Sequence, residues 1–318
     1  MPEKHMNIQR AWRPNGGNGP GRPIMLAIAG DSATGKTTLA KGLVDALGAD
    51  RITSICVDDY HRYDRKERKE KPFTALNPKC NYVDIMEQHL QLLAMGQPIL
   101  KPIYNHDHGT LDRPELVEPR EFVIAEGLLP LHTKLARACF DATVYLDPPE
   151  DIRVKWKLDR DTSKRGYTED EVREELKRRD PESNEFIRPQ KSHADIVVRF
   201  EPIEERGETV DDPLSAKLLL RPTIPHPDLS QILTDDTREA MHLKLTRDDD
   251  NKPVDTLHIH SYAERELTRK VEEAIWEELG VDEPLPESLG VIDEGQRDEP
   301  LALAQLILLY HLMQARHS

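Results

Sequence analysis

Residues 24–43 read IMLAIAGDSATGKTTLAKGL, which is a short apolar run, a glycine-bounded loop and a helix-forming segment in that order. The loop matches the pattern G-x-x-x-x-G-K-[ST] in the strand–loop–helix context that this pattern requires. Gly30 and Gly35 let the backbone turn so tightly that successive N–H groups point at a phosphate chain, and the positive end of the following helix adds to that field. The stretch therefore predicts a site for a nucleoside triphosphate.

The whole loop is a candidate binding surface for this triphosphate. Lys36 can reach the β- and γ-phosphates, and the hydroxyl of Thr37 can ligate Mg²⁺. We expect the nucleotide to be held by Gly30, Asp31, Ser32, Ala33, Thr34, Gly35, Lys36, Thr37 and Thr38. The motif alone does not show whether the γ-phosphate is transferred, hydrolysed or only bound. The class of nucleotide-binding protein must therefore be inferred from the remaining sequence.

The amino-acid composition argues against several classes of protein. The 318 residues include 44 Lys and Arg against 59 Asp and Glu, which gives a formal charge of −15 and argues against a nucleic-acid partner. The three cysteines form neither a disulfide framework nor a C-x-x-C pattern, so we expect a reducing, cytoplasmic setting. No apolar run reaches the roughly 18 to 20 residues that a membrane-spanning helix needs, and we expect no membrane partner.

Strands and helices alternate over the first two thirds of the chain. Apolar runs predict strands at 24–29, 52–60, 121–131, 142–150 and 194–200, and helical patterns predict helices at 38–47, 81–97, 151–161 and 168–182. Thr168 stands three residues before Glu171, a capping-box spacing, while the segment 101–119 is expected to be a loop. This alternation predicts an α/β fold with a mostly parallel sheet flanked by helices.

The last third of the sequence has a different pattern of apolar residues. Short alternating stretches predict antiparallel strands, with a hairpin around residues 248–252, and two helices follow at 262–280 and 301–313. The last helix is apolar on nearly every side, so we expect it to be packed or to lie at a subunit contact. We divide the chain into a flexible arm (1–22), a core that carries the phosphate loop (23–205) and a C-terminal α+β extension (206–318), and we expect a homodimer.

Acidic residues follow several predicted strands. Because ligands bind at the carboxyl ends of parallel strands, Gly30, Asp58, Glu126 and Asp147 are expected to converge on one crevice. Asp58 or Asp59 can accept a proton from an attacking alcohol, hold Mg²⁺, or cap the following turn. The basic run 61–71 comes directly afterwards, and it suits either a phosphorylated substrate or a solvated surface.

A second basic group lies on the helix predicted at 151–161 and just beyond it. Lys157, Arg160 and Asp161 stand at i, i+3 and i+4, and Lys164 and Arg165 follow. Spacing alone leaves two readings open. The first is a surface ion-pair face, and the second is a mobile lid whose cations neutralise charge on the transferred phosphoryl group.

These motifs together resemble the phosphoribulokinase family, a branch of the kinases with a phosphate-binding loop that also contains uridine kinase. The resembling pieces occur in the family's order: GDSATGKTT (30–38), VDDYHRYDRKERKEK (57–71), KPIYNHDHGTLDRPE (101–115), VIAEGLLPL (123–131), KLDRDTSKRGYT (157–168) and FIRPQKSHADIVV (186–198). The length and the C-terminal half resemble the plant, cyanobacterial and archaeal branch more than the shorter proteobacterial one.

The resemblance implies ATP- and Mg²⁺-dependent phosphorylation of the small molecule D-ribulose 5-phosphate at its 1-hydroxyl, a step of Calvin-type carbon fixation. It implies that Asp58 is the general base and that Glu126 joins Thr37 as a metal ligand. It assigns catalytic roles near the γ-phosphate to Lys36, Lys157, Arg160, Asp161 and Arg165, and substrate binding to His61, Arg65, Lys69, Tyr104 and His106.

One departure concerns redox control. The light-regulated plant enzymes carry a cysteine in the phosphate loop that pairs with one at the end of the second strand. Here Cys56 fits the second position but Thr34 occupies the first, so that disulfide is not expected and Cys56 is interpreted as a small buried hydrophobe.

Three rival functions can be compared with this resemblance. A guanine-specific site requires Asn-Lys-x-Asp, and the nearest run, residues 251–254, lacks the aspartate, which argues against a GTPase. A uridine-kinase-like nucleoside kinase would not need so many cations after Asp58. A non-catalytic ATP-binding partner protein need not keep Lys36, Asp58, Glu126 and Arg165 together.

Overall fold

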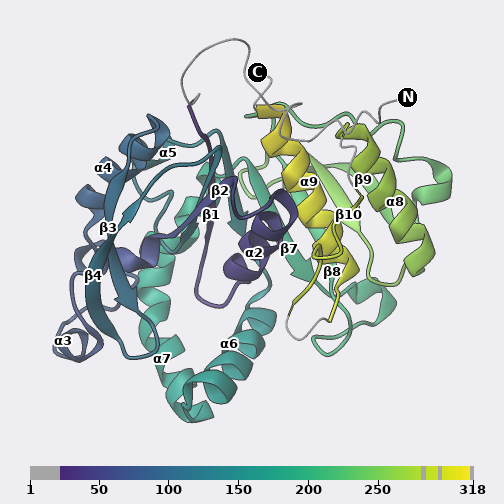
Figure 1. The fold of residues 1–318 in the computed structure, drawn as a ribbon. Coiled ribbons are helices and arrows are strands. Elements are labelled where there is room, and N and C mark those ends of the chain that lie inside the picture. The colour runs from purple at the N-terminus through teal and green to yellow at the C-terminus, as the bar shows by residue number, and fades with distance from the viewer. Residues whose placement is uncertain (1–21, 281–283, 293–295, 316–318) are drawn as a thin grey trace.

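The computed structural model describes residues 22–280, 284–292 and 296–315. Its main feature is a mixed sheet with the strand order β2-β5-β1-β6-β7-β8-β10-β9 (Figure 1). The first five strands in this order run parallel; they are β2 (Ile52–Cys56), β5 (Phe122–Gly127), β1 (Ile24–Gly30), β6 (Ala142–Leu146) and β7 (Ile196–Glu201). The predicted α/β class with a mostly parallel sheet is confirmed.

Three further strands extend the sheet in antiparallel fashion beyond β7. They are β8 (Ser215–Leu220), β10 (Pro253–Ile259) and β9 (Met241–Arg247). The hairpin expected around residues 248–252 joins β9 to β10. Asp248 Oδ1 accepts hydrogen bonds of 3.0 Å from the backbone N–H groups of Asp250 and Lys252, and Asn251 adopts φ 60°, which asparagine tolerates better than most residues.

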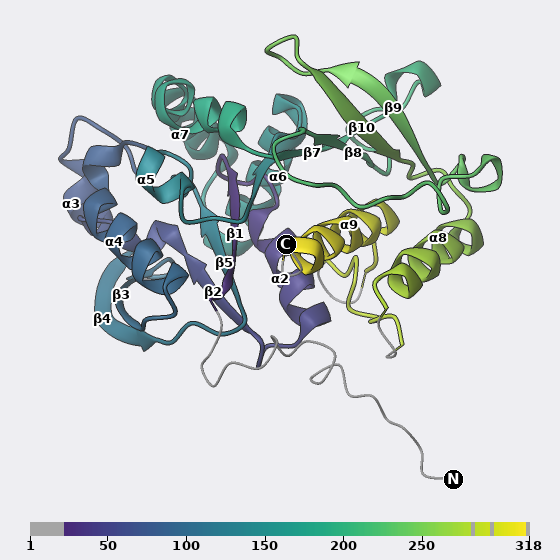
Figure 2. The same ribbon diagram turned by 90° about the horizontal axis from the view of Figure 1, so that it is seen from above.

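Helices cover both faces of the sheet (Figure 2). The helices α2 (Lys36–Leu47), α8 (Arg265–Glu278) and α9 (Glu299–Ala315) share one hydrophobic cluster with alternate residues of the strands. On the other face, α4 (Val83–Ala94) and the short α5 (Lys134–Arg137) share a second cluster with Met25 of β1 and with Val123 and Ala125 of β5. Residues Pro300–Met313 are all buried, so the apolar last helix is covered by its own chain.

Two helices project from the end of the sheet at which the parallel strands finish, at the bottom of Figure 1. They are α6 (Glu150–Arg165) and α7 (Glu169–Glu182). The capping box predicted from sequence is present, because Glu171 N donates to Thr168 Oγ1 at 3.3 Å and Glu171 Oε2 accepts from Thr168 N at 2.8 Å.

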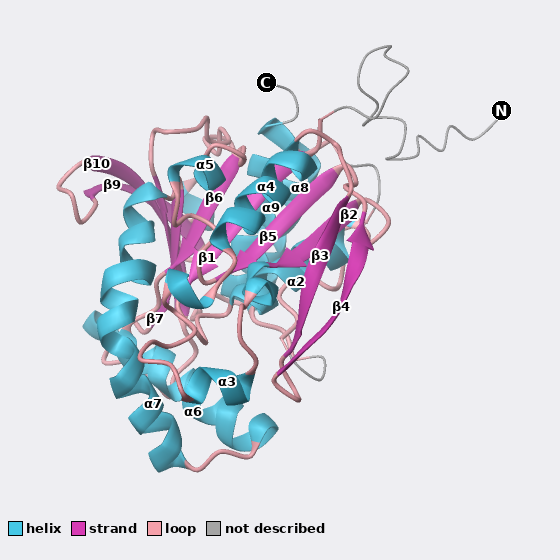
Figure 3. Ribbon diagram, turned by 90° about the vertical axis from the view of Figure 1, so that its left-hand side faces the viewer, coloured by secondary structure: helices cyan, strands magenta, loops and turns pink. Residues whose placement is uncertain are grey.

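The segment 101–119, which was expected to be a loop, is instead part of a two-stranded hairpin. This hairpin is a separate sheet from the one that begins at β2. It consists of β3 (Ile99–Asn105) and β4 (Thr110–Val117), beside α3 (Arg65–Lys69) (Figure 3). The loop prediction is wrong because the usual strand signal is missing: the side chains of β4 are almost all exposed, and prolines interrupt the run. Pro102 sits at a register shift of the ladder and Pro114 lies in the exposed strand, the positions in which a sheet tolerates proline.

Most other boundaries agree with the sequence to within a few residues. The strands expected at 52–60, 121–131 and 142–150 each end four residues earlier, at Cys56, Gly127 and Leu146. After β2 the chain turns through a 3-10 helix, Val57–Tyr60. Among the described residues, no helix has the combination of length and apolar character required to cross a membrane. The expected N-terminal arm lies outside the described residues, apart from Arg22.

Candidate active site

The phosphate loop connects β1 to α2 at the open end of the parallel strands. Gly30 is required by close packing, since a Cβ there would lie 2.7 Å from Thr34 Oγ1 and 2.9 Å from the carbonyl oxygen of Leu146. Gly35 has φ 91°, which disfavours any residue with a Cβ. The Lys36 ammonium donates to the carbonyl oxygens of Gly30 (3.0 Å) and Asp31 (2.7 Å), which fixes its charge within the loop.

The side chain of Asp31 braces this loop and does not line the cleft described below. Its carboxylate accepts hydrogen bonds from Ser183 Oγ (2.5 Å) and from the backbone N–H of Ser32 (2.6 Å), and it lies 3.7 Å from Arg153. Burial alone would raise the pKa of Asp31, but Arg153 and Ser183 outweigh it and the pKa is lowered. Arg153 also donates to the carbonyl oxygen of Ser32 at 3.3 Å, so α6 holds the loop in shape.

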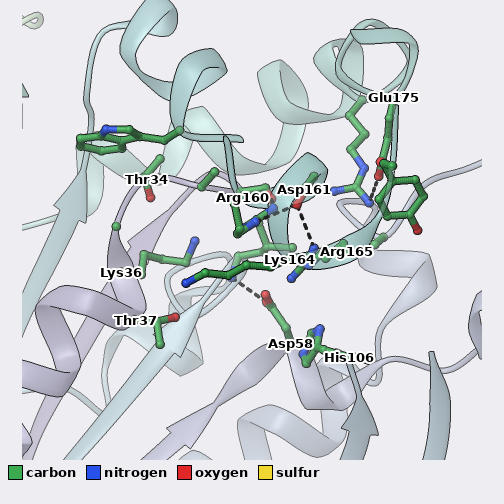
Figure 4. A pocket seen from close by; sticks show the side chains of 18 of the residues that line it. Thr34, Lys36, Thr37, Asp58, His106, Arg160, Asp161, Lys164, Arg165 and Glu175 are labelled. Carbon is green, nitrogen blue, oxygen red and sulfur yellow. Dashed lines mark hydrogen bonds and ion pairs between the residues drawn. The ribbon is translucent and has the colours of Figure 1, made fainter. Parts of the chain in front are cut away.

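A cleft of about 1280 Å³ opens over the loop, between the strand ends, the β3–β4 hairpin and the two projecting helices (Figure 4). It gathers most of the residues predicted from sequence: Ser32, Ala33, Thr34, Gly35, Lys36, Thr37, Thr38, Asp58, His61, Arg65, Lys69, Tyr104, His106, Glu126, Arg160, Asp161 and Arg165. The predicted residues Gly30, Asp31 and Lys157 do not line it.

Thr37 and Glu126 form the candidate metal site. Glu126 lies near the end of β5, and Thr37 Oγ1 donates to its Oε1 at 3.2 Å. Burial raises the pKa of Glu126, and the nearby Lys36 partly offsets this effect. A hydroxyl and a carboxylate oxygen so close to the phosphate loop are the hard ligands that Mg²⁺ prefers, and Mg²⁺ completes its shell with water and phosphate oxygens. These two residues therefore fit the metal.

Asp58 and Asp59, which sequence alone could not separate, point in different directions. Asp58 lines the cleft, where Figure 4 shows it beside His106, and its Oδ1 accepts a 2.8 Å hydrogen bond from the backbone N–H of Leu128. Asp59 is buried and bonds the hairpin, through the ammonium of Lys101 and the backbone N–H of Tyr104 (3.1 Å). Asp58 is therefore free to act in the cleft, and Asp59 positions the hairpin.

His61 is buried at the far side of the cleft. Asn81 uses its amide N–H groups to bond the carbonyl oxygens of Ala75 and Asn77, so its Oδ1 accepts from His61 Nδ1 at 2.6 Å. Burial, with the charge of Arg68, lowers the pKa of His61 to about 3. The ring is therefore neutral at pH 7 with a lone pair on Nε2, which suits a sugar hydroxyl better than a phosphate.

The basic residues beyond Asp58 differ in what they bond. Arg65 donates to the carbonyl oxygens of His106 (2.5 Å) and Asp107 (3.3 Å), and so fastens the tip of the hairpin. Arg68, which the sequence analysis did not select, donates through Nη2 to the Tyr104 hydroxyl, and its buried Nη1 has no hydrogen-bond partner among the described residues. Arg68 follows Arg65 at i+3 on α3. This spacing puts both side chains on one face of the helix, and it is the sequence signal that could have identified Arg68.

A similar donor comes from α7. The Arg179 side chain lines the cleft and pairs with Glu175, and its buried Nε has no hydrogen-bond partner in the described part of the chain. Arg68 and Arg179 both lower the pKa of His61, which places the two guanidinium groups near the same ring. This end of the cleft therefore holds buried cationic donors, as a phosphate monoester requires.

The cationic face of α6 is centred on Asp161. Its carboxylate pairs with Lys157 Nζ (2.7 Å), Arg160 Nε (2.8 Å) and Arg165 Nη1 (3.4 Å). Burial opposes ionisation, but the hydrogen bonds from Arg160 and Lys157 outweigh it and lower the pKa of Asp161 to about 2. Arg160 also reaches Ser32 Oγ at 3.3 Å, so the same cations form ion pairs and border the phosphate loop.

Two sequence-based expectations are corrected here. Lys157 was expected near the γ-phosphate, but its side chain is buried within the α6–α7 body and supports Asp161. Asp147 was expected in the crevice, but its carboxylate pairs with Lys191 at 3.0 Å and its carbonyl oxygen accepts from Arg199. In both cases a neighbouring element supplied a partner that strand and helix patterns do not reveal.

The three cysteines are unpaired. Cys56 is partly exposed, lines the cleft and stands beside Glu126 in the paired strands β2 and β5. Burial and the charges of Asp58 and Glu126 raise the pKa of this thiol, which disfavours the reactive thiolate. Thr34 Oγ1 donates to the carbonyl oxygen of Asp31 at 3.0 Å, a hydrogen bond that stabilises the turn of the phosphate loop.

Comparisons with known proteins agree with this geometry. The model of the phosphoribulokinase/uridine kinase family matches residues 25–205. The phosphoribulokinase of Synechocystis sp. is 42% identical over 181 residues, which cover 57% of this chain and 54% of that protein. The chloroplastic phosphoribulokinase of Triticum aestivum is 36% identical over 58% of this chain and 50% of its own. The chain thus spans about half the length of these relatives.

Two further similarities complete the comparison. The uridine kinase of Listeria welshimeri is 35% identical over 182 residues, 56% of this chain and 87% of that enzyme. The solved structure of the phosphoribulokinase from Rhodobacter spheroides superposes with a TM-score of 0.59 at 14% identity, covering 93% of this chain and 99% of that one, which is a likeness of fold. The chain belongs to the phosphoribulokinase/uridine kinase family.

Proposed function

We propose that this protein transfers the γ-phosphoryl group of ATP to O1 of D-ribulose 5-phosphate, forming ribulose 1,5-bisphosphate and ADP. The observation that carries the proposal is the order of groups along one cleft: the phosphate loop, then the Asp58 carboxylate, then buried cationic donors. A sugar phosphate bound by those donors presents a hydroxyl between Asp58 and the nucleotide. The relatives named phosphoribulokinase support the same substrate.

In this proposal the chain acts mainly by positioning and charge neutralisation, because phosphoryl transfer passes through a loose transition state. The loop and Lys36 hold the β- and γ-phosphates, while Arg160 borders the loop through Ser32. Mg²⁺, when bound at Thr37 and Glu126, supplies positive charge to the phosphate oxygens. Asp58 accepts the proton of the attacking 1-hydroxyl, with its carboxylate oriented by Leu128.

The sugar phosphate is proposed to lie against the basic end of the cleft. Arg68 and Arg179 each have a buried N–H for which the described residues supply no hydrogen-bond partner, and Lys69 also lines the cleft. His61 accepts a hydrogen bond from a sugar hydroxyl through Nε2. Tyr104 and His106 stack edge-on, with ring centroids 5.0 Å apart, and form the hairpin wall of this subsite.

A nucleoside kinase is the second candidate, because the uridine kinase of Listeria welshimeri is matched over 87% of its length. Uridine carries no phosphate, so it leaves the buried guanidinium donors unpaired, at a cost in binding. The test is the initial rate of ADP formation with ribulose 5-phosphate and with uridine at equal concentrations. Preference for ribulose 5-phosphate supports the proposal, and preference for uridine replaces it. ATP binding without transfer to either would indicate a non-catalytic partner protein.

We further propose a division into a kinase core (23–205) and an extension (206–318) that continues the same sheet. A homodimer in the cytoplasm remains the expected assembly and location. Sedimentation equilibrium of the full chain gives its mass directly: a species of twice the monomer mass supports the dimer, and a monomer at micromolar concentration rejects it.

A further inference from the structure

The helix α7 ends in a widened turn, where the chain returns from the two projecting helices to the core. Pro181 lies in the last turn of α7 and has no N–H group, so it interrupts the ladder of helical hydrogen bonds. The next residues, Ser183–Ile187, form a π-helix, a rare turn that is frequent at functional sites. Arg188 bridges this turn by donating to Asp180 Oδ1 (2.8 Å) and Asn184 Oδ1 (2.6 Å), which holds it in a defined shape.

Glu182, the last residue of α7, bonds a loop on the sugar side of the cleft. Its Oε2 accepts from the backbone N–H of Thr74 at 2.8 Å and from the Thr74 hydroxyl, and its Oε1 accepts from Asn77 Nδ2 at 2.8 Å. Thr74 lines the cleft. The carbonyl oxygen of Asn77 accepts from the amide of Asn81, the residue that orients His61. The Glu182 carboxylate therefore fixes a loop that shapes the sugar-phosphate subsite.

Ser183, the next residue, bonds the phosphate loop. Its hydroxyl donates to Asp31 Oδ2 at 2.5 Å, and Asp31 Oδ1 accepts from the backbone N–H of Ser32 at 2.6 Å. Only 1% of the Ser183 surface is exposed, so this bond to a carboxylate is shielded from water and strengthened by its surroundings. Two consecutive residues thus bond the loops on the two sides of the reacting groups.

We propose that Glu182 and Ser183 are positioning residues that couple the phosphate loop to the sugar-phosphate subsite. The inference rests on the proposed function, because that function places ATP at one loop and the sugar phosphate at the other. Neither residue lines the cleft, so they act through Thr74 and Asp31. Phosphoryl transfer requires the acceptor hydroxyl in line with the γ-phosphate, and a misplacement of about 1 Å can lower the rate roughly 10²-fold. Adjacent residues that bond both loops keep this alignment.

A double-mutant cycle tests whether the two bonds act as a unit. Glu182→Ala removes the acceptor of Thr74, and Ser183→Ala removes the donor to Asp31. We expect kcat to fall roughly 10- to 100-fold in each variant. The double variant should stay close to the slower single variant, because loss of either bond already releases one loop from the other. Glu182→Gln, which keeps an oxygen for Thr74, should recover part of kcat. Single losses that multiply in the double variant overturn the proposal.

The matched control comes from the same π-helix. Glu185 is an exposed acidic residue that does not line the cleft. Glu185→Ala should leave kcat and the KM for ribulose 5-phosphate unchanged. Rates are compared at a temperature below the Tm of every variant, so that a loss of folded protein is not counted as a loss of turnover. A fall in kcat for Glu185→Ala equal to that for Glu182→Ala would contradict a specific role for Glu182.

Hydrogen exchange measured by mass spectrometry gives a readout that does not depend on the acceptor. ADP binds at the phosphate loop, whereas the backbone N–H of Thr74 belongs to the sugar side. We expect ADP to slow exchange in peptides covering residues 72–80 of the original protein. This protection should persist in Glu185→Ala and be lost in Ser183→Ala, or in Glu182→Ala if the buried Ser183 variant does not fold.

Two outcomes of the exchange experiment overturn the proposal. The first is the absence of ADP-dependent protection in the original protein, and the second is equal protection in the original protein and in Ser183→Ala. If the protection follows the expected pattern but ribulose 5-phosphate is not phosphorylated, the proposed function fails while the coupling of the two loops stands.

Discussion

Asp58 Oδ1 accepts a hydrogen bond of 2.8 Å from the backbone N–H of Leu128, which follows Glu126 by two residues. The bond joins the turn after β2 to the end of β5, two neighbouring parallel strands. A Cβ on the intervening Gly127 would lie 2.5 Å from Val57 Cγ2 and 2.8 Å from Asp58 Oδ1, so only glycine allows this approach. The candidate base and the candidate metal ligand are thereby held in one fixed relation.

The first prediction concerns Asp58 itself. Asp58→Asn keeps the size of the side chain and an oxygen that can accept from Leu128, but it removes the proton acceptor. We expect kcat to fall roughly 10²- to 10⁴-fold while the dissociation constant of ADP is unchanged. Steady-state kinetics and calorimetry measure the two quantities. Near-normal turnover in this variant would reject the assignment of Asp58 as general base.

The second prediction concerns the metal. Glu126→Gln removes the charged ligand that accepts from Thr37 Oγ1, and a neutral amide binds Mg²⁺ weakly. We expect the Mg²⁺ concentration needed for half-maximal activity to rise at least tenfold. Thr37→Ser, which keeps the hydroxyl, is the matched control and should stay close to the original protein. An unaltered Mg²⁺ requirement in Glu126→Gln would place the metal elsewhere.

The third prediction concerns the buried guanidinium of Arg68. Arg68→Gln removes the bond to Tyr104 and the Nη1 donor, for which the described part of the chain supplies no partner. Loss of a charged hydrogen bond to phosphate costs about 1.5 to 3 kcal/mol, so we expect the KM for ribulose 5-phosphate to rise roughly 10- to 150-fold. Arg113→Gln, on exposed strand β4, should leave KM unchanged. Steady-state kinetics at saturating ATP measure the KM for ribulose 5-phosphate of both variants. Equal KM values for Arg68→Gln and Arg113→Gln would exclude Arg68 from the sugar-phosphate subsite.

The fourth prediction concerns acid stability. His242 and His258 stack at 4.8 Å across β9 and β10, and His260 Nε2 lies 2.9 Å from His242 Nδ1. Burial, with the neighbouring His242, lowers the pKa of both His258 and His260 to about 4. Because these pKa values lie below the unfolded value of 6.5, the unfolded chain binds more protons. Stability is therefore fully present above pH 6.5 and falls towards pH 4.

This loss should be smaller when one of the rings is replaced. His258→Gln removes a group that must be protonated on unfolding, so the decrease in Tm between pH 6.5 and 4 should be less steep than in the original protein. His108→Gln, at an exposed position, serves as the control and should follow the original curve. Thermal melts at half-unit pH steps provide the comparison. A curve for His258→Gln with the original slope would contradict the account.

The sequence predicted most of the core because each of its elements carries a local signal. The phosphate loop depends on glycine spacing, the parallel strands are uninterrupted apolar runs, and Thr168 with Glu171 forms the capping box that its spacing indicates. The hairpin at Asp248 was predictable for the same reason. Each of these features is decided by residues that are neighbours along the chain.

The features that escaped prediction depend on contacts between distant segments. Asp58 and Asp59 are chemically identical in the sequence. The structure distinguishes them, because Lys101 of the hairpin bonds Asp59 and holds it out of the cleft. Lys157 occupies a position typical of a surface cation, but α7 buries it. Trp156 and Leu301 line the same cleft, and no local pattern links residues so far apart in the sequence.

The most direct test of the central claim is ³¹P NMR of the full chain with Mg²⁺, ATP and ribulose 5-phosphate. The account predicts that the γ-phosphate signal is replaced by a second phosphate monoester on the sugar, on C1, in a one-to-one ratio with ADP, while the 5-phosphate remains. Release of inorganic phosphate with unchanged ribulose 5-phosphate, or no consumption of ATP, would contradict it.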